Sequence, residues 1–285
     1  MVTLNAELYV TDEAEVGESP LFDPDTGSFY WVDLTQGVLN ELTADGTRNR
    51  SVVAPLIGAI GLTAEPNRFA AIGEDGFGIV ADGQYTSRAP IDPQPGVFRM
   101  NDGKVDPRGR MWGGRTHYEF LGGVGSLHVW DGGDMQRTVT TGLGLPNGIG
   151  WSPDQRTMYF VDTTAHTLFR ATFDADDGEI GELQPLAIVT SGNPDGLAVD
   201  SDGCIWLAVW GGGHVLRISP EGAVIATVRL PVSRPASCAF GAGTELLITT
   251  ARMGVDTEAE PLAGSVFAVD VGIEAVPVAR FRGSA

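Results

Sequence analysis

Residues 17–33 of this chain read GESPLFDPDTGSFYWVD. An apolar stretch ends at Asp23, a turn follows, and the next run, FYWVD, is rich in the aromatic and β-branched residues that strands prefer. Related segments recur along the chain, anchored at residues 23, 65, 106, 152, 200 and 241, at intervals of 41 to 48 residues. This period is typical of a propeller blade or of a helical pair repeat.

The local pattern distinguishes these two folds. Residues before each anchor alternate between two faces, so that Ile149 and Trp151, like Leu197 and Val199, share one face, which is the period of a strand. A third strand-like run follows in most repeats, and no segment of ten or more residues has helical periodicity. Four short strands repeated six times predict an all-β fold, a six-bladed β-propeller, as a single domain over residues 1–285. Residues 4–11 are expected to pair with the last blade near residues 276–281 and close the ring.

One position in each repeat lies five residues before its anchor. In chain order these residues are Glu18, Ile60, Asn101, Asn147, Asp195 and Ala236. Equivalent positions of a rotational repeat converge on its axis, so two carboxylates and two amides are expected to meet there. Oxygen ligands suit Ca²⁺, Mg²⁺ or Mn²⁺, whereas the lack of His and Cys at these positions disfavours a structural zinc site. The alternative is a channel that only orders water, but buried unpaired carboxylates are costly without a cation. The pattern predicts a metal in the central channel.

The surroundings of this ring offer polar groups. Arg99 lies two residues before Asn101, at the predicted rim, where its guanidinium could hold a carbonyl or hydroxyl oxygen or could pair with a surface acid. Loops that contain Glu119, His166 and His214 are expected to open on the same face as the ring. The four histidines of the chain are not spaced as metal ligands.

The composition excludes several classes of function. A net charge of −19 and a pI near 4.4 disfavour nucleic acid and anionic membranes as partners. No run approaches the roughly 18 apolar residues of a membrane span, and no signal peptide is seen, so a cytoplasmic protein is expected. Cys204 and Cys238 lie in different repeats and are expected to be reduced packing residues. Ser19 lacks the G-x-S-x-G context of a serine hydrolase.

Five segments of this chain carry a family resemblance: GESPLFDPDTGSFYWVD, RMNDGKVDPRGRMWGG, LPNGIGWSPDQRTMYFVDT, NPDGLAVDSDGCIWLAVWGGG and PLAGSVFAVD. Together they resemble the senescence marker protein/gluconolactonase/luciferin-regenerating family, which includes regucalcin and bacterial sugar lactonases. The likeness extends over nearly the whole chain.

The resemblance implies one divalent metal ion, with Ca²⁺ first and Mn²⁺, Zn²⁺, Mg²⁺ or Fe(II) as alternatives. Its implied ligands are Glu18, Asn147 and Asp195, and Asp195 is also the implied general base. The implied substrate contacts are Arg99, Asn101 and Glu119. The loop GGRTHYEF departs from the small-residue G-T-M pattern of bacterial members, so the effects of Arg115 and His117 on the pocket, and the role of Glu119, stay open.

The leading hypothesis is a metal-dependent lactonase that opens a five- or six-membered sugar lactone to the aldonic acid. The metal would polarise the ring carbonyl, and Asp195 or a water held by the metal would deliver hydroxide. One alternative is a phosphotriesterase of the diisopropyl-fluorophosphatase type, and another is a non-catalytic, calcium-binding or protein-interaction propeller. The expected partner is a small-molecule lactone, and the expected assembly is a monomer or weak homo-oligomer.

Overall fold

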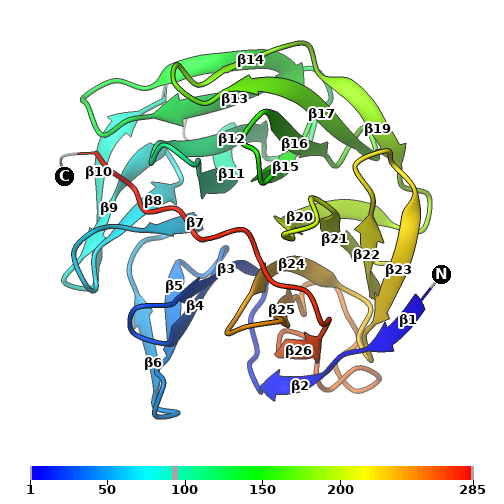
Figure 1. Cartoon of the computed structure of the whole chain (residues 1–285). Helices are drawn as coiled ribbons and strands as arrows, with labels where there is room; N and C mark the ends of the chain where they lie inside the picture. The colour runs from blue at the N-terminus through cyan, green and yellow to red at the C-terminus, as the bar shows by residue number, and fades with distance from the viewer. Residues whose placement is uncertain (1, 92–95, 284–285) are drawn as a thin grey trace.

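The computed structural model describes residues 2–91 and 96–283, and these residues form strands and turns with no helix. The strands make six sheets arranged around a central axis as the blades of a propeller (Figure 1). The prediction of an all-β, six-bladed β-propeller is confirmed. Within the same residues, no helix is long and apolar enough to cross a membrane.

Each of the first three blades is a meander of four strands, ordered from the axis outward. Blade 1 contains β3 (Gly17–Asp23), β4 (Ser28–Asp33), β5 (Val38–Leu42) and β6 (Arg48–Val52). Blade 2 contains β7 (Ile57–Leu62), β8 (Phe69–Gly73), β9 (Gly76–Ala81) and β10 (Gln84–Pro90). Blade 3 contains β11 (Phe98–Val105), β12 (Met111–His117), β13 (Gly125–Trp130) and β14 (Arg137–Leu143).

The last three blades have the same plan with additions. Blade 4 contains β15 (Pro146–Trp151), β16 (Thr157–Asp162), β17 (Thr167–Asp174), the short β18 (Glu179–Ile180) and β19 (Gln184–Ile188). Blade 5 contains β20 (Asn193–Val199), β21 (Ile205–Trp210), β22 (His214–Ile218) and β23 (Val224–Arg229). Blade 6 contains β24 (Pro235–Phe240), β25 (Glu245–Thr250) and β26 (Val266–Asp270).

The N-terminal segment completes the ring. Strand β2 (Glu7–Val10) pairs antiparallel with β26 and supplies the outer strand of blade 6, while β1 (Val2–Asn5) runs parallel to β23 of blade 5. Pairing with the last blade is therefore confirmed, but the expected partner at residues 276–281 was wrong. Those residues form no strand, because the chain leaves the sheet after β26 and bonds to other blades.

The C-terminal segment crosses the ring (Figure 1, red). The backbone N–H of Val276 donates to Val199 O at 3.4 Å, and that of Phe281 donates to Leu62 O at 2.7 Å. The Phe281 ring stacks on Trp130 with 4.8 Å between centroids. Because Val199 and Leu62 end innermost strands, this segment fastens the face opposite the one on which those strands begin.

The aspartates that anchor the repeat close its turns. Asp106 is fully buried, and its carboxylate accepts backbone N–H bonds from Arg108 and Arg110 at 2.8 and 3.0 Å. It also accepts the indole N–H of Trp112 at 2.9 Å. Asp200 holds Trp206 in the same way at 2.9 Å. Satisfying these buried donors explains why an aspartate stands before the turn in blades 3 and 5.

Blade 2 departs from the predicted alignment. Phe22 lies opposite Phe29 in blade 1, and Leu62 lies opposite Phe69 in blade 2. Counting back four residues from each, Gly58 is therefore the equivalent of Glu18, and the assignment of Ile60 to this position was wrong. The true anchor is Thr63, whose hydroxyl accepts the Glu65 N–H and donates to Arg68 O. The predicted anchor was the acid Glu65, whereas the hydroxyl of Thr63 closes this turn. The sequence alignment of blade 2 was therefore shifted by two residues.

Candidate active site at the centre of the ring

The predicted ring residues lie where the innermost strands are bulged. Strand pairing shifts between Met100 and Gly103 in blade 3, and between Pro146 and Ile149 in blade 4. It shifts in the same way between Pro194 and Leu197 in blade 5. A bulge frees its residues from the ladder and re-aims their side chains. Asn101, Asn147 and Asp195 lie within these three bulges.

Three of the ring residues carry an unsatisfied oxygen. Glu18 Oε2, Asn147 Oδ1 and Asp195 Oδ1 are buried and have no hydrogen-bond partner among the described residues. Their side chains belong to residues only 4%, 4% and 5% exposed. An unsatisfied buried polar atom costs about 1–3 kcal/mol, and more if it is charged. Three such oxygens from three blades form a donor set that a hard cation would satisfy.

The orientation of the Asn147 amide is set by a chain of hydrogen bonds. The Thr163 hydroxyl donates its proton to Pro194 O at 2.8 Å, so it can only accept from Asn147. Asn147 Nδ2 accordingly donates to Thr163 Oγ1 at 3.1 Å. The amide nitrogen is thereby held by Thr163, and Oδ1 is left free for a ligand.

Asn101 is bonded differently. Its Oδ1 accepts from Arg99 Nη1 at 2.7 Å, and its Nδ2 donates to Pro146 O at 3.0 Å. Arg99 Nη1 also donates to the Met100 carbonyl at 2.9 Å. Both ends of the Asn101 amide are engaged, which separates it from the three unsatisfied positions. Arg99 and Asn101 form a fixed pair of polar groups beside them.

The electrostatics of the site favour a cation. Burial raises the pKa of Glu18 well above its usual range, and the nearby Asp195 and Asp102 raise it further. Burial and Asp102 likewise raise the pKa of Asp195, against the lowering effect of the Asn147 amide. Arg99 opposes both shifts only weakly. The raised pKa values show that the positive charge near these two carboxyls is too weak to stabilise both of them in the ionised form.

Asp102 is a buried charge and Lys104 a half-buried one, and the sequence analysis selected neither. Burial raises the pKa of Asp102 to about 6, although Lys104 lowers it. Lys104 Nζ donates to Leu197 O at 2.6 Å and joins blade 3 to blade 5. Their position in NDGK, directly after Asn101, is the signal that could have indicated them.

The rim contains the remaining predicted residue. Glu119 is exposed on the loop between β12 and β13, and its backbone N–H donates to His117 Nδ1 at 3.0 Å. It is not part of the buried ring. Its neighbours Tyr118 and Phe120 have their ring centroids 6.0 and 5.6 Å from Arg99 Cζ.

The residues that depart from the bacterial loop pattern pack beside this rim. Arg115 Cζ lies 3.7 Å from the centroid of the Phe98 ring, and the His117 ring meets that ring edge-on at 5.3 Å. Both side chains thus flank an aromatic residue at the start of β11. They lie outside the ring, and the strand register places them on the opposite face of β11 and β12 from Arg99.

The donor set depends on an amide. Among residues 2–91 and 96–283, no three or more His, Cys, Asp and Glu side chains are grouped to hold a metal. An ion at the ring would therefore need Asn147 beside Glu18 and Asp195. Cys204 and Cys238 are buried free thiols, and burial raises the pKa of Cys238 to about 12, in keeping with packing residues.

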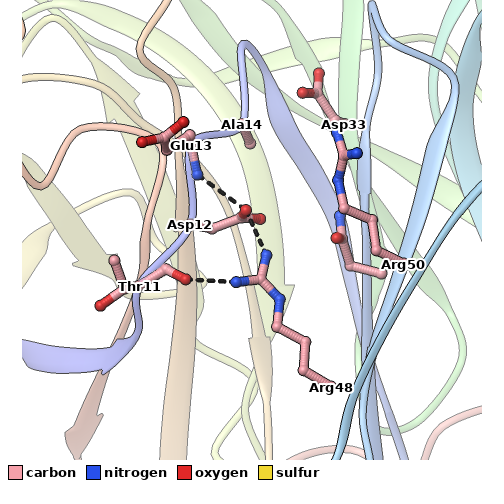
Figure 2. A pocket seen from close by; sticks show the side chains of 8 residues that line it. Thr11, Asp12, Glu13, Ala14, Asp33, Arg48 and Arg50 are labelled. Carbon is pink, nitrogen blue, oxygen red and sulfur yellow. Dashed lines mark hydrogen bonds and ion pairs between the residues drawn. The ribbon is translucent and has the colours of Figure 1, made fainter.

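A separate pocket of about 500 Å³ lies between blade 1 and the N-terminal segment (Figure 2). Arg48 is held there by Asp12 and donates to Thr11 O at 2.6 Å. None of the ring residues lines this pocket, so it is distinct from the candidate site.

Comparisons with known proteins agree with this description. A family model described as the SMP-30/Gluconolactonase/LRE-like region matches residues 16–252. The 6-deoxy-6-sulfogluconolactonase of Pseudomonas putida is 33% identical, covering 96% of this chain and 97% of that protein. Pentonolactonase XacC of Haloferax volcanii is 31% identical, covering 95% and 96%. The structure of a calcium-binding protein, regucalcin, from Agrobacterium tumefaciens has a TM-score of 0.89 at 29% identity, covering 99% and 98%.

Proposed function

This chain belongs to the SMP-30/gluconolactonase/LRE-like family, and we propose that it is a metal-dependent hydrolase that opens a sugar lactone to the aldonic acid. Relatives named for sulfogluconolactone and pentonolactone hydrolysis support a lactone with a five- or six-membered ring as substrate. The observation that carries the proposal is the set of three unsatisfied oxygens on Glu18, Asn147 and Asp195.

These three residues would hold one divalent cation. Their oxygens match a hard ion, so Ca²⁺ is the first candidate, in agreement with the calcium-binding regucalcin neighbour. Bound there, the cation would polarise the lactone carbonyl and favour the ionised forms of the two carboxyls.

The protein side chains would supply binding and proton transfer. Arg99 is fixed on Asn101 through one nitrogen, so the rest of its guanidinium can donate to substrate hydroxyl or carbonyl oxygens. Asp195 would accept the proton of the attacking water as general base and return it to the ring oxygen when the C–O bond breaks. Glu119 would contact the distal hydroxyls from its exposed loop.

A metal add-back experiment tests this function. The protein is stripped with chelator, and acid release is followed for aldonolactones and for a phosphotriester with Ca²⁺, Mg²⁺, Mn²⁺, Zn²⁺ or Fe(II) added. We expect lactone opening that depends on the metal and is lost in Glu18→Gln. Equal rates with and without metal would overturn the proposal. Triester turnover without lactone turnover would favour a phosphotriesterase, and metal binding without turnover would favour a binding protein.

A further inference from the structure

Ser191 and His214 form a hydrogen-bonded pair outside the ring. Ser191 lies on the loop between β19 and β20, and His214 begins β22, so the pair joins the connection from blade 4 to the third strand of blade 5. Ser191 Oγ and His214 Nε2 are 2.9 Å apart. The serine is exposed and the histidine is half-buried.

The tautomer of His214 follows from its second hydrogen bond. Nδ1 lies 2.6 Å from the carbonyl oxygen of Gly212, which can only accept, so Nδ1 carries the proton. Nε2 is then an acceptor, and the Ser191 hydroxyl donates to it. A nucleophile bonded to a base, which a third group orients, is the arrangement of an activated serine. Here a backbone carbonyl takes the orienting role.

The backbone around this pair is closely packed. A Cβ on Gly212 would lie 2.8 Å from both His214 Cε1 and Ser191 O. Gly192 has a φ of +152°, and a Cβ there would lie 2.7 Å from Trp210 O. The two loops therefore approach through glycines, and this contact holds Ser191 against the turn that carries His214.

The pair borders a pocket of about 640 Å³. Ile188, Leu216 and Leu230 contribute an apolar wall, which suits an acyl or alcohol group. Arg229 also lines the pocket and lies directly opposite His214 across β22 and β23, so both side chains share one face of the sheet. Its guanidinium makes no ion pair with any described residue, which leaves it available for developing negative charge.

We propose that Ser191 is a nucleophile for small carboxylic esters, with His214 as its base, in a second site that needs no metal. Ser191 Oγ attacks the ester carbonyl carbon, and its proton passes to His214 Nε2. The bond to the alcohol oxygen then breaks, the alcohol leaves with that proton, and the acyl group stays on Ser191. Water attacks the acyl-serine with His214 again taking the proton, which returns to Ser191 Oγ as the carboxylic acid departs.

The main alternative is a purely structural bond. Ser191 precedes Asp195 by only four residues, so its bond to His214 could do no more than hold the loop that enters β20. None of Glu18, Asn147 and Asp195 lines the pocket beside Ser191. Removing the metal therefore separates chemistry at Ser191 from chemistry at the ring.

The test uses the full-length, chelator-treated protein with p-nitrophenyl acetate and with a fluorophosphonate probe. We expect a single adduct by intact mass, located on Ser191 by peptide mapping, and none in Ser191→Ala. His214→Gln should slow acylation by about 10²-fold or more. The controls are Ser51→Ala, an exposed serine of β6, and His166→Gln, on the corresponding loop of blade 4, and both should react as the parent does.

An adduct that persists in Ser191→Ala, or a wild-type protein that forms none, overturns the proposal. Loss of metal affinity in Ser191→Ala, without any adduct in the parent, assigns the bond a structural role instead. Because neither readout uses lactone turnover, failure of this proposal leaves the proposed lactonase unaffected.

Discussion

Glu18 of blade 1 and Asp195 of blade 5 meet near the axis with one buried, unsatisfied carboxylate oxygen each, and the charge of Asp195 raises the pKa of Glu18. Two such groups disfavour the folded state when both are ionised and no cation is present. The ring therefore lowers the stability of the metal-free protein and, for the same reason, provides a strong binding site for a cation.

The metal-free protein is expected to lose stability as the pH rises. The folded-state pKa values of Glu18, Asp195 and Asp102 are raised, so folding retains protons that the unfolded chain releases. This contribution is complete below the ordinary carboxyl range near pH 4 and is lost as the pH rises through about 6 for Asp102 and through the raised pKa values of Glu18 and Asp195. Urea unfolding in chelator between pH 5 and 8 measures it.

Asp195→Asn should raise the stability of the metal-free protein at pH 8 by about 1–3 kcal/mol and flatten this pH dependence. The exposed change Glu182→Gln is the control and should have no effect. At the same concentration, added Ca²⁺ should stabilise the parent more than Asp195→Asn, which keeps an oxygen ligand but loses a charge. A parent protein whose metal-free stability is constant over this pH range would contradict the electrostatic description.

Metal holding and proton transfer can be separated at Asp195 and Asn147. Asp195→Asn keeps an oxygen but removes charge and basicity, so lactone hydrolysis should fall by about 10²- to 10⁴-fold even at full metal occupancy. Asn147→Ala removes only an oxygen ligand, so excess metal should restore part of its rate. Lactonase rate is measured against metal concentration, with occupancy determined directly. Equal rescue of the two variants would exclude Asp195 as the base.

Gly58 should tolerate no side chain. A Cβ at this position would lie 1.9 Å from the backbone oxygen of Asn101, so Gly58→Ala must displace blade 3 at the ring. We expect a loss of about 1–3 kcal/mol or more in unfolding free energy, together with a higher KM. Gly133→Ala, where the nearest contact is 3.4 Å, is the matched control.

A substitution of Ile60 should lower stability without the change in KM expected for Gly58→Ala. Ile60 is 3% exposed in the apolar contact between blades 1 and 2, so Ile60→Ala should cost about 2–5 kcal/mol in stability while KM stays unchanged. A change in KM without a loss of stability would place Ile60 at the pocket after all.

Arg99→Lys tests the preformed pair. Lysine keeps the charge but lacks the fork that holds Asn101 Oδ1 at 2.7 Å. We expect kcat/KM to fall about tenfold or more while the affinity for metal, measured by calorimetry, is retained. Arg156→Lys, on an exposed turn, serves as the control. Unchanged kcat/KM would remove Arg99 from the substrate contacts.

Glu119→Gln tests the rim. If its carboxylate binds hydroxyls equally in the ground and transition states, KM should rise and kcat should stay constant. The exposed control Glu182→Gln should change neither constant. A fall in kcat alone would point to a catalytic role, and no change in either would show that the loop carries Glu119 away from substrate.

The fold could be predicted because it repeats. With six copies of one strand pattern, an error in a single repeat does not change the predicted fold. Blade 2 is an example: Thr63 closes its turn, so its ring position is Gly58 and not the predicted Ile60. The partner of the N-terminal strand could not be predicted in the same way. Many alternating segments can accept an edge strand, and the choice of β26 depends on where the chain leaves the last blade.

The sequence alone determined the periodic architecture and the set of ring residues with side-chain oxygens, since strand alternation and repeat offset are local properties. Only the tertiary structure decided how those oxygens are bonded. Arg99 donates to Asn101 Oδ1, whereas Thr163 accepts from Asn147 Nδ2 and so leaves Asn147 Oδ1 available for a ligand. These hydrogen bonds set the direction of each amide. The pair of Ser191 and His214, 23 residues apart, likewise exists only where two loops meet through glycine contacts that the linear order does not reveal.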